Sequence, residues 1–315
     1  MPNMTPRTLS ELKLDPIVFP VTDDLAGLER FLPDAPDEIE RFALLAVKTP
    51  SILDIRGRAV AHEMQMDRLV ALAGDDPIGL EARADTANAL AVLAHAGQIA
   101  QMLVPARTEQ DRWAQAEVAH ERKRAARRSK SRRDAALLRR ACSGAPPRIK
   151  EHRLASPTAL SDSVTAMARF VGAILPEPTD DRSARTGEPG AYRLEDAHSL
   201  EAYFAAPPDL AELVAGAGAL LERSDGWSRA DHSAGKIDDA VQAAQVLAYA
   251  RLARVGLWPA RSAGDLQSKA DAETIVARRS TDPDHLRALV LLALDVGHTI
   301  ARQSDRFRSI QTVEL

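Results

Sequence analysis

Cysteine, aromatic residues and long apolar runs are all scarce in this sequence. The 315 residues include one cysteine, Cys142, so no disulfide can form within the chain. Aromatic residues make up 4%, which disfavours a β-rich fold, because strands are enriched in aromatic and β-branched side chains. The best apolar run, residues 288–294, is far shorter than the ~20 residues of a membrane-spanning helix. The first residues lack the apolar core of a secretory signal. We therefore expect a cytoplasmic protein.

Sequence motifs that commit a chain to a reaction are also missing. There is no Gly-x-x-x-x-Gly-Lys-Ser/Thr phosphate loop and no Gly-x-Ser-x-Gly nucleophile turn. His62-Glu63 is not followed by the second histidine of a zinc-protease helix. We therefore predict no catalytic residues and no cofactor. An enzyme of unfamiliar type, with a helical pocket near His298, stays open as a third hypothesis.

Two Glu-x-x-His pairs have the spacing of metal ligands. Glu117 with His120, and Glu195 with His198, are spaced like the ligand pairs that helices present in di-iron bundles. The first pair adjoins a strongly basic run, whose cations would compete with a metal ion, and the second follows a polar loop. We therefore predict no metal site.

Abundant alanine and apolar residues at steps of three and four predict an all-α fold. Alanine is the best helix former, and such steps place residues on one helical face. A proline followed by acids at 36–38 is typical of a helix start, and Asp282 and Pro283 suit the cap and first residue of the last helix. Further helices are predicted, in whole or in part, over residues 51–73, 79–104, 106–141, 157–175, 196–205, 208–223 and 237–255.

The breaks between these helices predict two helical subdomains with one long, strongly basic helix between them. Residues 1–142 form the first, which begins with an extended arm at residues 1–21, where two prolines oppose a helix or central strand, and ends in the basic helix. Residues 143–157, which begin with Ser-Gly-Ala-Pro-Pro, are the predicted linker. Residues 158–315 form the second subdomain, and its polar loop 176–191 is expected to be mobile.

The net charge of -4 conceals a strongly uneven distribution. Residues 1–121 carry a net -9 and residues 151–315 a net -6, whereas residues 122–150 carry a net +11. Ten of the nineteen residues from 122 to 140 are lysine or arginine. So dense a block needs neutralisation by a partner or by the rest of the chain. The candidate contact residues are Arg122, Lys123, Arg124, Arg127, Arg128, Lys130, Arg132, Arg133, Arg139 and Arg140.

The string Arg-Lys-Arg-Ala-Ala-Arg-Arg-Ser-Lys-Ser-Arg-Arg, at residues 122–133, resembles the basic region of leucine-zipper DNA-binding proteins. The resemblance covers about twelve residues. Arg122 stands where that family has its base-reading asparagine, and no leucine heptads follow, so no dimer fork would direct the helix. The resemblance is therefore one of composition.

Two functions remain open for this block. The leading hypothesis is a non-enzymatic binding protein, a subunit of a larger assembly, whose basic helix contacts the phosphates of DNA or RNA with weak sequence specificity. The block contains no aromatic residue on which single-stranded bases could stack. The alternative is a structural or adaptor protein whose basic helix pairs with an acidic protein surface. A third possibility is that the basic run is only a solvent-exposed connector and binds no partner.

Overall fold

The fold is all-α over the part of the chain that the computed structural model describes, which is residues 23–35, 37–48, 50–73, 84–129, 194–229 and 236–310. Four predicted segments lie outside the described residues: the arm at 1–21, the linker 143–157, the helix at 157–175 and the loop 176–191. The elements are α1 (Asp24–Gly27), the 3-10 helix η2 (Leu28–Phe31), α2 (Glu38–Lys48), α3 (Ile52–Ala73), α5 (Ala84–Leu103), α6 (Glu109–Ser129), α10 (Leu194–Ala205), α11 (Leu210–Arg229), α12 (Lys236–Leu257), α13 (Ala263–Arg278) and α14 (Asp284–Ile310).

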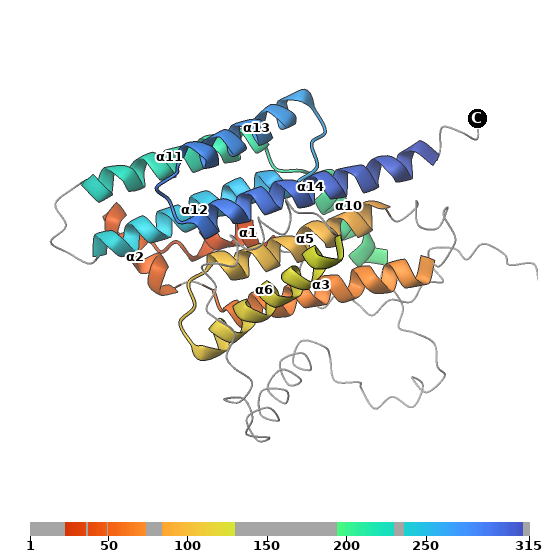
Figure 1. Cartoon of the computed structure of the whole chain (residues 1–315), viewed down its shortest axis with the longest axis horizontal. Helices are drawn as coiled ribbons and strands as arrows, with labels where there is room; N and C mark the ends of the chain where they lie inside the picture. Colours follow the sequence, from red (N-terminus) through yellow and green to blue (C-terminus); the bar gives the residue numbers. More distant parts are fainter. Residues whose placement is uncertain are drawn as a thin grey trace, which may run out of the picture.

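The long helices lie in stacked rows, with α11 and α13 at one side and α3 and α6 at the other (Figure 1). Between them, α12 packs against α11, α14, α2 and α5, while α5 packs against α3, α10 and α14. Helices α5 and α12 are buried around most of their circumference, which explains why alanine dominates both: small side chains let neighbouring helices approach from several sides.

Helices α12 and α14 approach each other closely at two glycines. A Cβ atom added to Gly297 would overlap with the carbonyl oxygen of Gly256 and lie 2.9 Å from that of Leu257. A Cβ atom on Gly256 would lie 2.8 Å from the backbone nitrogen of Leu294. Both glycines are therefore required by packing, because no larger residue fits between the two backbones.

Helices from both predicted subdomains share this packing. One buried apolar cluster includes Phe42, Leu93 and Ile99 from the first half of the chain and Leu252 and Leu289 from the second. The described residues therefore do not confirm an arrangement in two subdomains. The predicted linker, residues 143–157, lies outside the described residues.

Local signals account for most helix ends. The side chain of Asp37 accepts a hydrogen bond from the backbone of Ile39 at the predicted start of α2. Ser262 and Asp265 form a reciprocal capping box at the start of α13, a helix that the sequence analysis did not predict. Asp282 precedes α14 as expected, but its carboxylate binds Arg279 and Tyr249.

Among the described residues, no single helix is long and apolar enough to cross a bilayer. The bent pair of Ser199–Ala205 and Leu210–Arg229 would be long and apolar enough if the two segments are taken together.

Candidate functional site

Helix α6 contains the beginning of the predicted basic segment in its C-terminal half, and its N-terminal half is fixed to the body of the protein by Arg56 of α3. The Arg56 guanidinium lies 5.2 Å from the ring centre of Trp113. It donates a hydrogen bond to the backbone oxygen of Ala114 at 3.4 Å and pairs with Glu117 at 2.6 Å. The Arg56 side chain is 11% exposed, so this contact is largely shielded from water and from salt.

The corner between α5 and α6 is fixed by side chains that bind backbone groups. The backbone nitrogen of Asp111 donates to the Thr108 hydroxyl at 3.0 Å, and that of Thr108 donates to the Asp111 carboxylate at 2.9 Å. Gln115 donates to the carbonyl oxygens of Gln101 and Val104, each at 2.8 Å, which satisfies acceptors at the end of α5. The first three turns of α6 are therefore held firmly.

The structure describes the predicted site as far as Ser129. Helix α6 includes Arg122, Lys123, Arg124, Arg127 and Arg128 in its backbone, and their side chains are not described. The other predicted contact residues lie outside the described residues: Lys130, Arg132, Arg133, Arg139 and Arg140. The predicted continuation of the helix to residue 141 stays a prediction.

Helix geometry relates this segment to the packed face of α6. Asp111, Gln115, Val118 and Ala119 are buried. At 3.6 residues per turn, position 122 falls in line with Asp111, Gln115 and Val118, whereas positions 124 and 128 continue the row of Trp113 and Glu117, which contact Arg56 of α3.

A buried polar cluster lies at the junction of α1, α3, α10 and α12. Asp23 caps α1 by accepting from the backbone nitrogens of Leu25 and Ala26. Its other carboxylate oxygen accepts from Arg254 at 2.6 Å and from the Tyr203 hydroxyl at 3.1 Å. This aspartate joins three helices, and each of its contacts is a structural one.

Asp24 and His62 are two of the buried groups that have unsatisfied polar atoms among the described residues. Asp24 pairs with Arg58, yet its Oδ2 atom has no hydrogen-bond partner among the described residues, and burial raises the pKa of its carboxyl above the ordinary value. His62 is 1% exposed, and neither ring nitrogen has a hydrogen-bond partner in the described part of the chain. Burial lowers the pKa of His62 to about 4, assisted by the positive charge of Arg58. His62 is therefore neutral at pH 7.

A second polar cluster joins α11, α12 and the turn before α14. Arg279 donates to both carboxylate oxygens of Asp225, at 2.8 and 2.7 Å, and to Asp282 at 2.5 Å. The Tyr249 hydroxyl donates to Asp282 at 2.8 Å. Hydrogen bonds from Arg279 hold the pKa of Asp225 below its ordinary value. All these groups are used in holding helices together.

Lys269 of α13 is a buried cation at the end of α12. Its ammonium group donates to the carbonyl oxygens of Val255 and Gly256 at 3.0 and 2.6 Å, where the negative end of the α12 dipole lies. The residue is 5% exposed, and burial lowers the pKa of its ammonium group to about 8. The two carbonyl contacts identify it as a helix cap.

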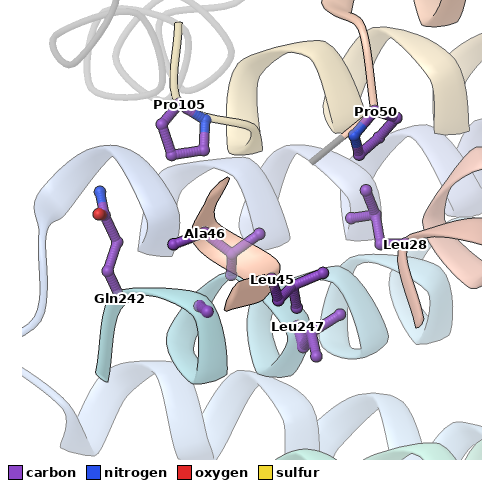
Figure 2. A pocket seen from close by; sticks show the side chains of 9 residues that line it. Leu28, Leu45, Ala46, Pro50, Pro105, Gln242 and Leu247 are labelled. Atoms are coloured by element: carbon purple, nitrogen blue, oxygen red, sulfur yellow. The ribbon is translucent and has the colours of Figure 1, made fainter. Parts of the chain in front are cut away.

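A small depression in the described surface is apolar. It lies where η2, α2 and α12 meet and is lined by Leu28, Leu45, Ala46, Val246 and Leu247, among others, with Gln242 at its edge (Figure 2). No acid, base or nucleophile lines it, so it has no catalytic chemistry of its own.

The predicted alternatives for chemistry find little support. Among the described residues, no group of three His, Cys, Asp or Glu side chains is close enough to bind a metal ion. Glu117 pairs with Arg56, and His298 is exposed on α14. The side chains of Glu195 and His198 are not described.

The buried clusters were not found from the sequence, because their members are far apart in the chain: Asp23 and Arg254 are separated by 231 residues. No local pattern marks such pairs. Comparison with protein-family models, with curated proteins and with solved structures finds no match to this chain.

Proposed function

We propose that this protein is a helical binding protein that contacts nucleic-acid phosphates through its basic segment, residues 122–140, within a larger assembly. The observation that carries the proposal is the net charge of +11 over residues 122–150, between two acidic parts of the chain. A duplex carries a phosphate charge every ~1.7 Å of its axis, and each phosphate that is neutralised releases counterions.

The arrangement of α6 supports this proposal. Its N-terminal half is fixed to α3 and α5, and its described buried side chains lie between Asp111 and Ala119. A helix that is held to the protein along its N-terminal half and is cationic along its C-terminal half is suited to lie against a phosphate backbone.

Binding of this kind rests on charge, so little sequence specificity is expected. Phosphate contacts position a protein on a nucleic acid but carry no base information. The absence of aromatic residues from 122–140 removes the stacking contacts that single-stranded binders use.

A charge-reversal experiment tests the proposal. The variant Arg124→Glu/Arg127→Glu/Arg128→Glu should lose at least 100-fold in affinity for a 20-base-pair DNA duplex, measured by fluorescence anisotropy at low salt. The matched control Arg112→Glu/Arg278→Glu/Arg302→Glu makes the same change in net charge at exposed positions and should lose far less. Equal losses in the two variants would contradict a specific role for the segment.

An acidic protein partner is the alternative. The chain itself joins its helices through arginine–carboxylate pairs such as Arg56–Glu117 and Arg254–Asp23, so its arginines suit carboxylate partners as well. Affinity purification with and without nuclease separates the two proposals: nuclease should release the partners of a nucleic-acid complex and leave a protein complex intact.

A further inference from the structure

Helix α3 is attached to the body of the protein mainly through its contact with α5. Its packing partners in the described chain are α5 and, to a lesser extent, α6, whereas α12 packs against α11, α14, α2 and α5. Figure 1 shows α3 and α6 together at one side of the stacked helices. On α3, Ala59 lies against Gly97 of α5. Separation of α3 from α5 would therefore leave the contacts of α12 with its other neighbours in place.

The buried face of α3 contains one titratable side chain, that of His62. The other described side chains that are buried on this helix are apolar: Ile52, Ile55, Ala59 and Leu69. His62 is 1% exposed, and neither ring nitrogen has a hydrogen-bond partner among the described residues. A protonated imidazole would bring two N–H donors and a charge into this contact, and an unpaired buried charge is strongly unfavourable.

We propose that His62 is an acid-sensitive switch, whose protonation separates α3 from α5 while the helices around α12 stay folded. This inference is independent of the proposed function.

The charged groups of α3 and α1 do not neutralise a protonated His62. Arg58 lies one turn before His62 on α3, and its positive charge opposes protonation of the imidazole. Asp24 of α1 is paired with Arg58. Glu63 accepts a hydrogen bond from Gln98 of α5. Both carboxylates are therefore engaged with other groups.

Helices α5 and α6, which pack against α3, provide no partner either. The titratable residues of α5 are Asp85, which is exposed, and His95, which is half-buried. Where α6 contacts α3, Glu117 is paired with Arg56, and His120 is half-buried. None of these side chains bonds to a ring nitrogen of His62. Protonation would therefore place an unpaired charge between α3 and α5.

Opening of this contact is linked to the pH. Burial lowers the pKa of His62 from 6.5 to about 4, assisted by the charge of Arg58. Between these values the opened form, in which water reaches the ring, binds a proton that the closed form does not bind. Opening therefore becomes more favourable as the pH falls. With these two pKa values, the equilibrium constant for opening should rise about 20-fold from pH 7 to pH 5.

Hydrogen exchange of the full chain, followed by mass spectrometry at pH 7 and pH 5 and corrected for the intrinsic exchange rates, tests the proposal. Exchange in peptides of α3 should rise about 20-fold at the lower pH, and exchange in peptides of α12 should change far less. The rise in α3 should disappear in His62→Leu and persist in the control His298→Leu. Asp24 is common to all three chains, so its own titration cancels in the comparison.

An equal rise in α3 and α12 of the parent chain would overturn the proposal, because it would indicate unfolding of the whole protein. An undiminished rise in His62→Leu would also overturn it. Thiol reactivity gives a second measurement in a Cys142→Ser background. Ile55→Cys on α3 and Leu252→Cys on α12 replace side chains that are both 0% exposed. The rate of reaction with a pyridyl disulfide, relative to the urea-unfolded chain, should rise with acid at residue 55 only, and the same change at both positions would refute the switch.

Discussion

Replacing His62 by leucine should stabilise the protein and remove part of its sensitivity to acid. The imidazole is buried between helices, and neither ring nitrogen has a hydrogen-bond partner among the described residues. A buried polar group left unpaired costs about 1–3 kcal/mol. Leucine has a similar size and brings no polar atom, so the His62→Leu variant should gain about that much free energy of unfolding at pH 7.

The acid sensitivity follows from the lowered pKa. Burial lowers the pKa of His62 from 6.5 to about 4, so between these values the unfolded chain binds a proton that the folded chain does not. The free energy of unfolding must therefore fall as the pH falls from about 6.5 to about 4. At 1.36 kcal/mol per pKa unit, the loss is about 3 kcal/mol.

Urea denaturation at pH 7, 6, 5 and 4, followed by helical circular dichroism, measures both effects. The difference in stability between His62→Leu and the parent chain should grow by about 3 kcal/mol from pH 7 to pH 4, because carboxylates common to both chains cancel. The control His298→Leu replaces an exposed histidine and should show no such growth. A constant difference for His62→Leu, or a loss of stability at pH 7, would refute this reasoning.

Three further predictions concern groups that hold helices together. The pKa of Lys269 is lowered from 10.5 to about 8, so between these pH values the unfolded chain binds more protons than the folded chain. The free energy of unfolding should therefore rise by about 3 kcal/mol as the pH rises from about 8 to 10.5. Urea denaturation at several pH values should show this rise in the parent chain and no such rise in Lys269→Met. Gly297→Ala should cost about 1–3 kcal/mol by overlap with a backbone carbonyl of α12, whereas Gly218→Ala, with open space at its Cβ, should gain about 0.5–1 kcal/mol in the same assay. Arg279→Met leaves two aspartates without their cation and should lower stability by about 3 kcal/mol, against a change within about 0.5 kcal/mol for the exposed neighbour Arg278→Met.

The helices could largely be predicted from the sequence, because their signals are local. The acidic start at residue 38, the periodic segment that became α5 and the stripe of α12 all matched helices in the structure. Helix α13 was missed since its apolar residues are few, although the Ser-x-x-Asp sequence at Ser262 and Asp265 was a signal that could have found it.

The packing of these helices could not be predicted in the same way. The glycines that bring α12 and α14 together are marked by no motif, and the pairs of Asp23 with Arg254 and Arg279 with Asp225 join residues distant in the chain. The expected division into two subdomains came from the breaks in the sequence. Such breaks carry no information on which helices pack together, so the packing of α5 against α10, α12 and α14 could not be predicted from them. The basic segment, by contrast, was visible in composition alone.

The salt dependence of binding by the full chain to a 20-base-pair DNA duplex tests the central claim most directly. Five cations of the basic segment lie within α6, and ten lie within residues 122–140. At about 0.9 per phosphate contact, the logarithm of the binding constant should fall against the logarithm of salt concentration with a slope between about -4 and -9. Absent binding, or a slope near zero, would contradict the account.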